Sequence, residues 1–368
     1  MARVHGSPPW SDLLPELLGL VFLRLRTRTD RAIFPAVCRA WCSAARQCQL
    51  PPPPSPVPWL ARPSSCPTTR ATTPRGDWIL LSRDDHSCFL MNPFTEDTMP
   101  LPRLSSYTYY EEPVEVPEGY HGLTSTWMQY YDYNKVDMFV PSLVVCPEGL
   151  IAAIVAIDGD LRTIALCRPG SAAWSVSAHE KCRRYSHMVF FQGKLYALDT
   201  ETDLIAIDIL DERGRDKPRV SRIEFVVYRS YFPRPWQYHF LFMYYLLESY
   251  GSLLMTVAGS STFQVFKADF ERHVWAEVTT LGNDQALFLG QGCSRAVRVS
   301  PSDLSGDCIF FLDDYVDTNS CWTRITTSCG LHDMKDERIH SPLPMVSWRN
   351  GDVPATWVFW QDVCDRIC

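Results

Sequence analysis

One unit recurs four times along the 368-residue sequence: an apolar run, a polar turn, a glycine and a second apolar run. The glycines are Gly149, Gly193, Gly251 and Gly306, and the spacings between them are 44, 58 and 55 residues. Two apolar runs joined by a short turn that contains glycine predict a β-hairpin. Because one such unit per period is typical of proteins that stack similar units, we expect a repeat fold.

Two copies extend the pattern with a tryptophan. Trp174 follows Gly149 by 25 residues, and Trp275 follows Gly251 by 24 residues. Both tryptophans stand in short alternating segments that predict another strand. A hairpin, a third strand and a Trp-bearing fourth strand predict the four-stranded blade of a β-propeller, in which neighbouring blades cover each other's apolar faces. A β-sandwich with irregular loops is the alternative, but it would not explain the repeated offset between glycine and tryptophan.

Two parts of this mainly β region depart from the repeat. Residues 211–235 are charged and contain prolines, which predicts a surface insertion that lengthens one blade. Beyond Asp314 the pattern is weaker, and residues 357–360 (Trp-Val-Phe-Trp) are the candidate for the final strand.

Residues 8–48 predict a small domain of three helices. Pro15 suits the first turn of the first helix, Pro35 interrupts the second, and the third covers residues 37–45. The next segment, residues 49–77, has nine prolines between positions 51 and 74 and predicts a semi-rigid linker. The propeller would then occupy residues 78–368.

The first predicted helix is apolar on two sides. One stripe at helical spacing consists of Leu14, Leu18, Val21, Phe22 and Leu25, while Leu17, Leu20 and Leu23 lie off it. So short a domain cannot bury this much apolar surface in its own core. Part of the surface is therefore expected to contact a partner protein.

Charge is unevenly distributed along the chain. Residues 1–48 contain seven arginines and three acidic residues, a net charge of +4, whereas the whole chain carries −7 and the remainder therefore −11. A basic head on an acidic body predicts that the head meets an acidic partner. It also predicts no general affinity of the body for nucleic acid.

The fourteen cysteines indicate a compartment. The N-terminus lacks the apolar core of a secretory signal, and no stretch reaches the roughly 20 apolar residues that a membrane-spanning helix needs. We therefore expect reduced thiols, mostly buried as small apolar side chains, in the cytoplasm or nucleus, and no membrane partner.

The sequence predicts no catalytic residues, no cofactor and no metal. It has no P-loop, no Gly-x-Ser-x-Gly and no His-Glu-x-x-His motif, and its Gly-x-Gly at Gly290 and Gly292 predicts a turn between strands. Cys321, Cys329 and His332 lack the paired short spacings of zinc sites. An enzyme with a site at the propeller's central channel is the alternative, but no motif supports it.

Two motifs at the N-terminus resemble the start and the end of an F-box: Leu14-Pro15-Glu16-Leu17-Leu18 and Val37-Cys38-Arg39-x-Trp41. A generic amphipathic helix pair is the alternative. The resemblance implies docking on a Skp1-like protein, from a family of acidic proteins, and through it on a cullin. The residues that it implies for partner contact are Leu14, Pro15, Leu18, Val21, Phe22 and Leu25, with Val37, Cys38 and Trp41 holding the third helix or adding contacts.

The body resembles plant F-box proteins whose C-terminal part is the domain of unknown function 295, or KIB-type β-propeller. The segments that carry the resemblance are Asn92-Pro93-Phe94-Thr95, 247–255, 263–269, 275–278, 286–294 and 307–314. The resemblance covers residues 78–314 best. It implies a non-catalytic substrate-recognition subunit of a Skp1–cullin–F-box (SCF) ubiquitin ligase, whose propeller binds an unidentified protein for ubiquitination and degradation. The alternative is a regulator outside any ligase, which sequesters a partner through the propeller.

Overall fold

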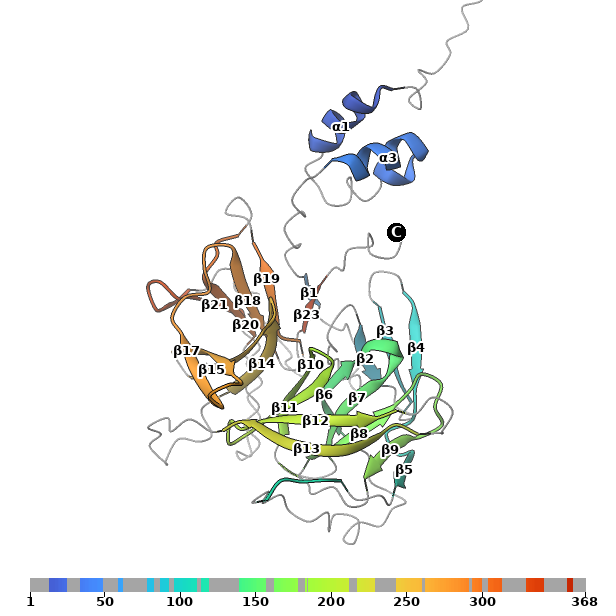
Figure 1. The fold of residues 1–368 in the computed structure, drawn as a ribbon, viewed down its shortest axis with the longest axis vertical. Helices are drawn as coiled ribbons and strands as arrows, with labels where there is room; N and C mark the ends of the chain where they lie inside the picture. The colour runs from blue at the N-terminus through green and yellow to red at the C-terminus, as the bar shows by residue number, and fades with distance from the viewer. Residues whose placement is uncertain are drawn as a thin grey trace, which may run out of the picture. The chain divides into compact units, whose positions relative to one another are not determined.

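The computed structural model divides the chain into two compact units, Met1–Pro56 with Trp360–Cys368, and Val57–Phe359. Each unit is described by itself (Figure 1). The structure describes residues 13–24, 34–48, 59–61, 78–82, 87–92, 96–110, 114–118, 139–156, 162–177, 183, 185–211, 217–228, 243–259, 262–290, 293–299, 304–312, 329–340 and 356–359.

The first unit contains the helices. They are α1 (Pro15–Arg24), the short 3₁₀ helix η2 (Phe34–Ala36) and α3 (Arg39–Gln47). Pro15 begins α1, as expected of a residue that lacks an N–H in the first helical turn. Pro35 lies inside η2, so the middle predicted helix is a single 3₁₀ turn in the described part of the chain.

The second unit is a β-propeller of five blades, which we number in chain order (Figure 1). Blade 1 contains β2 (Ile79–Ser82), β3 (Cys88–Met91) and β4 (Thr98–Leu101). Blade 2 contains β6 (Phe139–Val145), β7 (Ile151–Ala156), β8 (Arg162–Cys167) and β9 (Trp174–Ser177), with β5 (Tyr107–Tyr110) added beside β9. Blade 3 contains β10 (Tyr185–Phe191), β11 (Lys194–Asp199), β12 (Leu204–Leu210) and β13 (Arg219–Val227).

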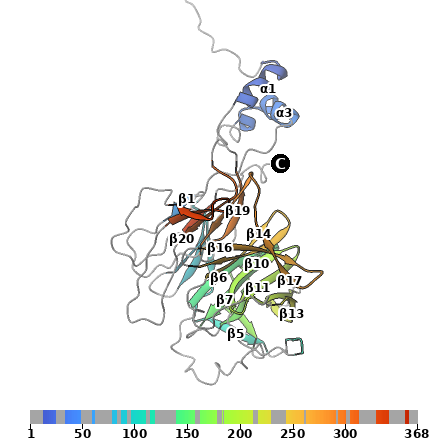
Figure 2. The ribbon, with the colours of Figure 1, turned by 90° about the vertical axis from the view of Figure 1, so that its left-hand side faces the viewer.

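Blade 4 contains β14 (Met243–Ser249), β15 (Ser252–Ala258), β16 (Phe263–Asp269) and β17 (Val274–Val278). Blade 5 has the strand order β19 (Arg295–Arg298), β18 (Gln285–Leu289), β20 (Cys308–Leu312), β21 (Cys329–Asp333) and β22 (Arg338–His340). The first strands β6, β10 and β14 lie side by side, and β19 lies against β14 (Figures 1 and 2). The prediction of a mainly β chain with a propeller of four-stranded blades is confirmed.

Three of the four repeat glycines form the predicted turns. Gly149, Gly193 and Gly251 join the first two strands of blades 2, 3 and 4 with φ angles of 78°, 84° and 82°. Side chains other than hydrogen rarely adopt this left-handed region. The periodic glycines therefore mark the position at which each blade begins its first hairpin.

The prediction of a hairpin at Gly306 is wrong. The strands on either side of this position do not form an antiparallel pair, because β18 and β20 run parallel, with β19 beyond β18. A Cβ atom added at Gly306 would lie 2.1 Å from the carbonyl oxygen of Asn283. A glycine is required here because the backbone of Asn283 comes very close. In a sequence pattern, a glycine at such a close approach looks the same as a glycine in a turn.

The prediction of a surface insertion at residues 211–235 is wrong over residues 219–227, while residues 212–216 and 229–235 lie outside the described part of the chain. Residues Arg219–Val227 form β13, the fourth strand of blade 3. Its charged residues lie in a strand whose pairing with β12 shifts register twice, so that buried Val220, Ile223 and Val227 do not alternate regularly. Such bulges remove the period of two by which a strand is detected.

Tryptophan indoles connect consecutive blades. Trp174 in blade 2 donates its indole N–H to the carbonyl of Pro102, the residue after β4 of blade 1, at 3.1 Å. Trp275 in blade 4 donates its indole N–H to the carbonyl of Thr202 in blade 3, at 2.8 Å. Both tryptophans are buried, at 0% and 5% exposure. A buried N–H needs an acceptor, so the repeated tryptophan fixes the spacing between blades as well as filling the core.

The ends of the second unit pair with each other. β1 (Trp59–Ala61) and β23 (Thr356–Val358) form an antiparallel ribbon, and the indole of Trp357 donates to the carbonyl of Leu289 in blade 5 at 2.9 Å. Trp357 and Phe359 belong to the blade 5 core. The candidate final strand is thus confirmed over 356–358. Strand β1, however, lies inside the segment predicted as a linker, where three residues without proline retain the N–H groups that a ladder needs.

A buried histidine makes the stability of the propeller dependent on pH. His187 of β10 packs against Tyr245 of β14, and burial, aided by the charge of Arg162, lowers its pKa from 6.5 to about 4. The unfolded chain therefore binds a proton that the folded chain does not bind between these values. We expect the wild type to lose up to about 3 kcal/mol of stability relative to His187→Phe as pH falls from 6.5 to 4.

Urea unfolding of both proteins at several pH values measures this difference. Phenylalanine keeps the ring contact and does not titrate. A difference in stability that stays constant over this range would show that the pKa of His187 is the same in the folded and the unfolded chain.

Candidate functional site

The helical unit packs around a small core. Leu18, Phe34 and Ala44 are buried, and the ring of Phe34 lies 5.0 Å from that of Phe22 and 4.4 Å from that of Trp41. Gly19 allows this close packing, because a Cβ atom at its position would lie 3.3 Å from the sulfur of Cys48. One side of α1 therefore faces η2 and α3.

The other side of α1 is apolar and exposed. Leu14 is 63% exposed, Leu17 45%, Leu20 51% and Val21 40%, and Val37, just before α3, is 52% exposed. Successive residues of a helix are about 100° apart, so these four positions lie within an arc of about 120°, next to the buried face of Leu18 and Phe22. We call Leu14, Leu17, Leu20 and Val21 the apolar face, and Val37 is a further exposed apolar residue of the helical unit.

The structure separates the nine residues implied for partner contact. Leu14, Pro15, Val21 and Val37 are exposed, and Phe22, Cys38 and Trp41 are partly buried. Leu18 is 0% exposed in the core of the unit, so its contact with a partner stays a prediction. Leu25 lies outside the described residues.

The sequence analysis missed Leu17 and Leu20 as candidate contact residues. The residues that the F-box resemblance implies in the first helix lie along one stripe, but two members of that stripe, Leu18 and Phe22, face the helical core. The signal that could have identified the two leucines was their position off that stripe, since an apolar residue with no place in a small core remains exposed.

Charges on this unit follow the helix dipoles. Glu16 lies in the first turn of α1, Arg24 in its last turn and Arg46 in the last turn of α3. These positions favour the helices electrostatically. Arg24 and Arg46 are both exposed, which supports the expected attraction to an acidic partner.

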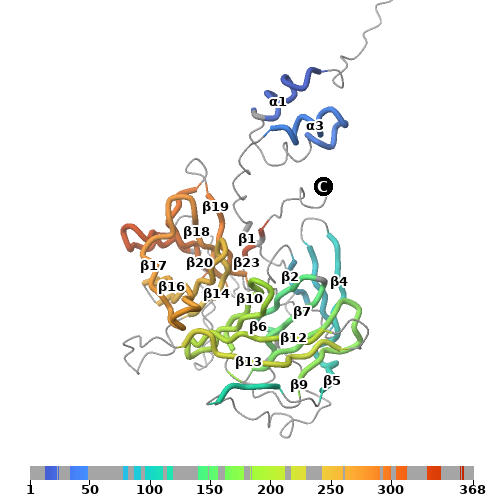
Figure 3. Tube along the Cα trace, viewed as in Figure 1, coloured from blue at the N-terminus to red at the C-terminus, as the bar shows by residue number. Residues whose placement is uncertain are grey.

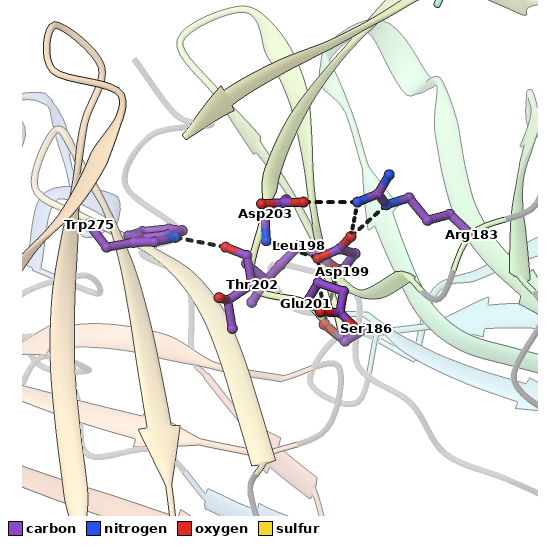
Figure 4. Close-up of polar contacts among 8 residues, drawn as sticks. All are labelled: Arg183, Ser186, Leu198, Asp199, Glu201, Thr202, Asp203 and Trp275. Atoms are coloured by element: carbon purple, nitrogen blue, oxygen red, sulfur yellow. Dashed lines mark hydrogen bonds and ion pairs between the residues drawn. The ribbon is translucent and has the colours of Figure 1, made fainter. Parts of the chain in front are cut away.

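In one buried charged cluster of the propeller, the charged groups pair with one another (Figure 4). The Asp199 carboxylate accepts from Arg183 Nε at 2.5 Å and from the backbone N–H groups of Glu201 and Asp203 at 2.9 Å. Arg183 also pairs with Asp203 at 2.9 Å and lies 4.8 Å from the ring centroid of Phe225. The cluster fixes a turn and does not present free groups to a substrate.

The described cysteines of the propeller are packing residues. Burial raises the pKa of the Cys88 and Cys146 thiols to about 12 and that of Cys308 to about 11. A thiol that stays protonated is a poor nucleophile and a poor metal ligand. Among the residues that the structure describes, no group of three or more His, Cys, Asp or Glu side chains is placed to hold a metal ion.

No helix in the described part of the chain is both long enough and apolar enough to span a membrane.

Comparisons with known proteins agree with the propeller fold, and the curated relatives that they find are named F-box proteins. Residues 50–337 match the family model of the KIB1-4 beta-propeller. An F-box/kelch-repeat protein of Arabidopsis thaliana is 23% identical over 339 residues, covering 82% of each chain. A putative F-box protein of the same plant is 26% identical over 172 residues, covering 38% of this chain and 41% of its own length.

A third relative, also an F-box protein of Arabidopsis thaliana, is 27% identical over 135 residues and covers 29% of this chain and 32% of its own. Among solved structures, YCF48 from Cyanidioschyzon merolae aligns with 12% identity and a TM-score of 0.30, covering 70% of this chain and 73% of its own, which is too distant to carry an argument. The family model spans more than half of the chain, and the five blades have the architecture that it describes. The chain therefore belongs to the KIB1-4 β-propeller family.

Proposed function

We propose that this chain is a non-catalytic substrate-recognition subunit of an SCF-type ubiquitin ligase. The helical unit docks on a Skp1-like protein and through it on a cullin. The propeller holds the target protein so that its lysines lie close to a ubiquitin-charged enzyme carried by other subunits. Cytoplasm or nucleus is the compartment that fits this role.

The apolar face of α1 is the observation that carries this proposal. A helical unit whose own core takes Leu18, Phe34 and Ala44 still exposes five large apolar side chains. Each is about half exposed, so completing its burial would contribute roughly half of the 1.5–3 kcal/mol of a fully exposed side chain. Five such residues offset only the lower part of an association cost of about 4–15 kcal/mol, so charge attraction and further contacts must add to this face.

The test replaces residues that contact the partner without entering the helical core. We expect Leu17→Asp combined with Val21→Asp to weaken binding to a purified Skp1-like protein at least about 100-fold, because two carboxylates would be buried against apolar surface. Isothermal titration calorimetry with the full chain measures the affinity, and far-UV circular dichroism checks that the helices remain.

Ser43→Asp is the matched control. Ser43 is exposed on α3 and is not part of the apolar face, and its substitution adds one of the two negative charges that the double variant adds. Its affinity is expected to stay within about twofold of the wild type. Docking through the apolar face is refuted if wild type does not bind, or if the double variant binds as tightly as Ser43→Asp.

Sequestration outside a ligase is the second candidate, since binding a Skp1-like protein does not by itself bring in a cullin. The two roles differ in the fate of the captured protein. In a ligase, proteasome inhibition raises its level only when the wild-type chain, and not the double variant, is present. Under sequestration the inhibitor makes no difference between the two.

A further inference from the structure

The outer edge of a blade is the side of its last strand that faces away from the other strands of that blade. In two of the five blades, another segment of the chain pairs with this edge. β5 pairs in parallel with β9 of blade 2. Glu115 forms a parallel β-bridge with Arg222 of β13. The backbone carbonyl of Glu115 accepts from the N–H of Ile223 at 2.8 Å, and its backbone N–H donates to the carbonyl of Ser221 at 2.9 Å. An extended, parallel segment is therefore how this molecule completes the outer edge of blades 2 and 3.

Two other outer edges are unsuited to pairing. β4 of blade 1 contains Pro100, which has no N–H to donate. β22 of blade 5 has only three residues, and two of them are Arg338 and His340. Short, charged or proline-bearing edge strands are the usual protection against unwanted strand addition.

The outer edge of β17 in blade 4 has none of these protections. Its five residues pair with β16 in unbroken register, contain no proline and carry a single charge, Glu277. Val274, Ala276 and Glu277 are exposed, and no described strand pairs with the outer side of β17 (Figure 3). A regular open edge of this kind is a template for another strand.

Exposed aromatic surface continues from the start of β17. Tyr228, at the end of blade 3, is 55% exposed and donates its backbone N–H to the carbonyl of His273 at 3.1 Å. The rings of Tyr228 and His273 are 6.2 Å apart, and Val274 follows directly in the chain. Tyrosine beside an open strand edge is a composition enriched at protein interfaces.

We propose that the outer edge of β17 binds an extended segment of the recruited protein, as a fifth strand parallel to β17. The two segments of the chain that pair with β9 and β13 indicate what sequence the bound segment would have. Residues 107–110 are Tyr-Thr-Tyr-Tyr and residues 114–116 are Val-Glu-Val. Here Glu277 favours lysine or arginine across from it, since opposite charges stabilise neighbouring strands. The inference rests on the proposed function, in which the propeller holds the target.

The probe is a fluorescein-labelled peptide of about ten residues that alternates valine or tyrosine with lysine or threonine. Binding to the full chain is measured by fluorescence anisotropy. Two further versions carry N-methyl groups on odd or on even residues. A strand bonds to one neighbour through every second residue, so we expect one version to bind at least about tenfold more weakly than the other.

Ala276→Pro and Glu277→Pro test the edge from the side of the protein. Successive N–H groups of a strand point to opposite sides, so one of the two substitutions removes an outward N–H and leaves the β16–β17 pairing intact. The variant whose melting temperature is unchanged is expected to lose peptide binding. Its matched control, threonine at the same position, keeps the N–H group and is expected to bind like wild type.

Hydrogen exchange supplies an internal comparison. Peptide binding is expected to protect amides of β17 and to leave β9 and β13 unchanged, because their edges are already paired. The proposal is overturned if no saturable binding occurs up to about 1 mM, if both N-methylated versions bind equally, or if the proline variants bind like wild type. It is also overturned if sedimentation shows a dimer that either proline variant dissociates, since a second copy would then be the occupant.

These outcomes are separable from those of the proposed function. Docking on a Skp1-like protein is measured with variants of α1, whereas peptide binding is measured with variants of β17. Loss of one result leaves the other standing.

Discussion

A chain that begins at Trp78 is expected to be less stable than a chain that begins at Val57 by about 3–6 kcal/mol. The shorter chain lacks β1, so the backbone of β23 loses its partner along Trp59, Leu60 and Ala61. Release of β23 would then expose Trp357 and Phe359, which are 4% and 6% exposed in the blade 5 core. A loss of this size lowers the melting temperature of a propeller of this length by roughly 5–10 °C.

Differential scanning calorimetry of the two chains measures the effect, and Leu60→Pro in the full chain gives an independent version of it. Leu60 pairs with Trp357, and proline removes one N–H from the ribbon without shortening the chain. Leu60→Val is the control. Equal melting temperatures for the chains that begin at Val57 and at Trp78 would show that the ribbon does not contribute to closing the propeller.

The closing ribbon illustrates which parts of the fold the sequence could predict. The C-terminal strand was predictable because two tryptophans and a phenylalanine within four residues must be buried somewhere. Its partner was not, because Trp59, Leu60 and Ala61 stand among prolines and are too few to show a period. Pairing between residues 59 and 358 is set by the closure of the whole ring, which no local pattern contains.

The candidate site shows the same limit at smaller scale. The helical spacing of its apolar residues indicated that α1 is apolar on two sides. The exposed leucines show that the core of the helical unit covers only one of these sides. Which side is inside depends on Phe34 and Ala44, which come from other elements. The helical period alone therefore could not show that Leu18 is buried while Leu17 and Leu20 are exposed.

Asp199→Ala is expected to destabilise the propeller by about 3–5 kcal/mol. The substitution leaves the Arg183 guanidinium, 14% exposed, without its closest acceptor, and the N–H groups of Glu201 and Asp203 without the oxygen that they share. Burial raises the pKa of Asp199 to about 6, against the opposing effect of Arg183, so the carboxylate is mainly ionised at pH 7.5 and the guanidinium loses a charged partner.

Three comparisons separate charge from turn geometry. Asp199→Asn keeps an oxygen for the two backbone donors, and we expect it to cost less than Asp199→Ala. Asp203→Ala removes the more exposed acceptor of Arg183 and is expected to cost about 1–2 kcal/mol. Arg183→Met in the Asp199→Ala background is expected to recover part of the loss, because the unpaired buried charge is gone.

The same turn holds blade 4 in place, so the effect of Asp199→Ala is expected to spread beyond blade 3. Thr202 lies in this turn with a φ of 71°, a strained value for a β-branched residue, and its carbonyl accepts the Trp275 indole at 2.8 Å. If Asp199 enforces that conformation, its loss frees the carbonyl to rotate, and hydrogen exchange becomes faster in β16 and β17 as well as in β11 and β12. Exchange that accelerates only within blade 3, or a cost of Asp199→Ala below about 1 kcal/mol, would show that Trp275 is held by packing alone and that the buried ion pair does not connect the blades.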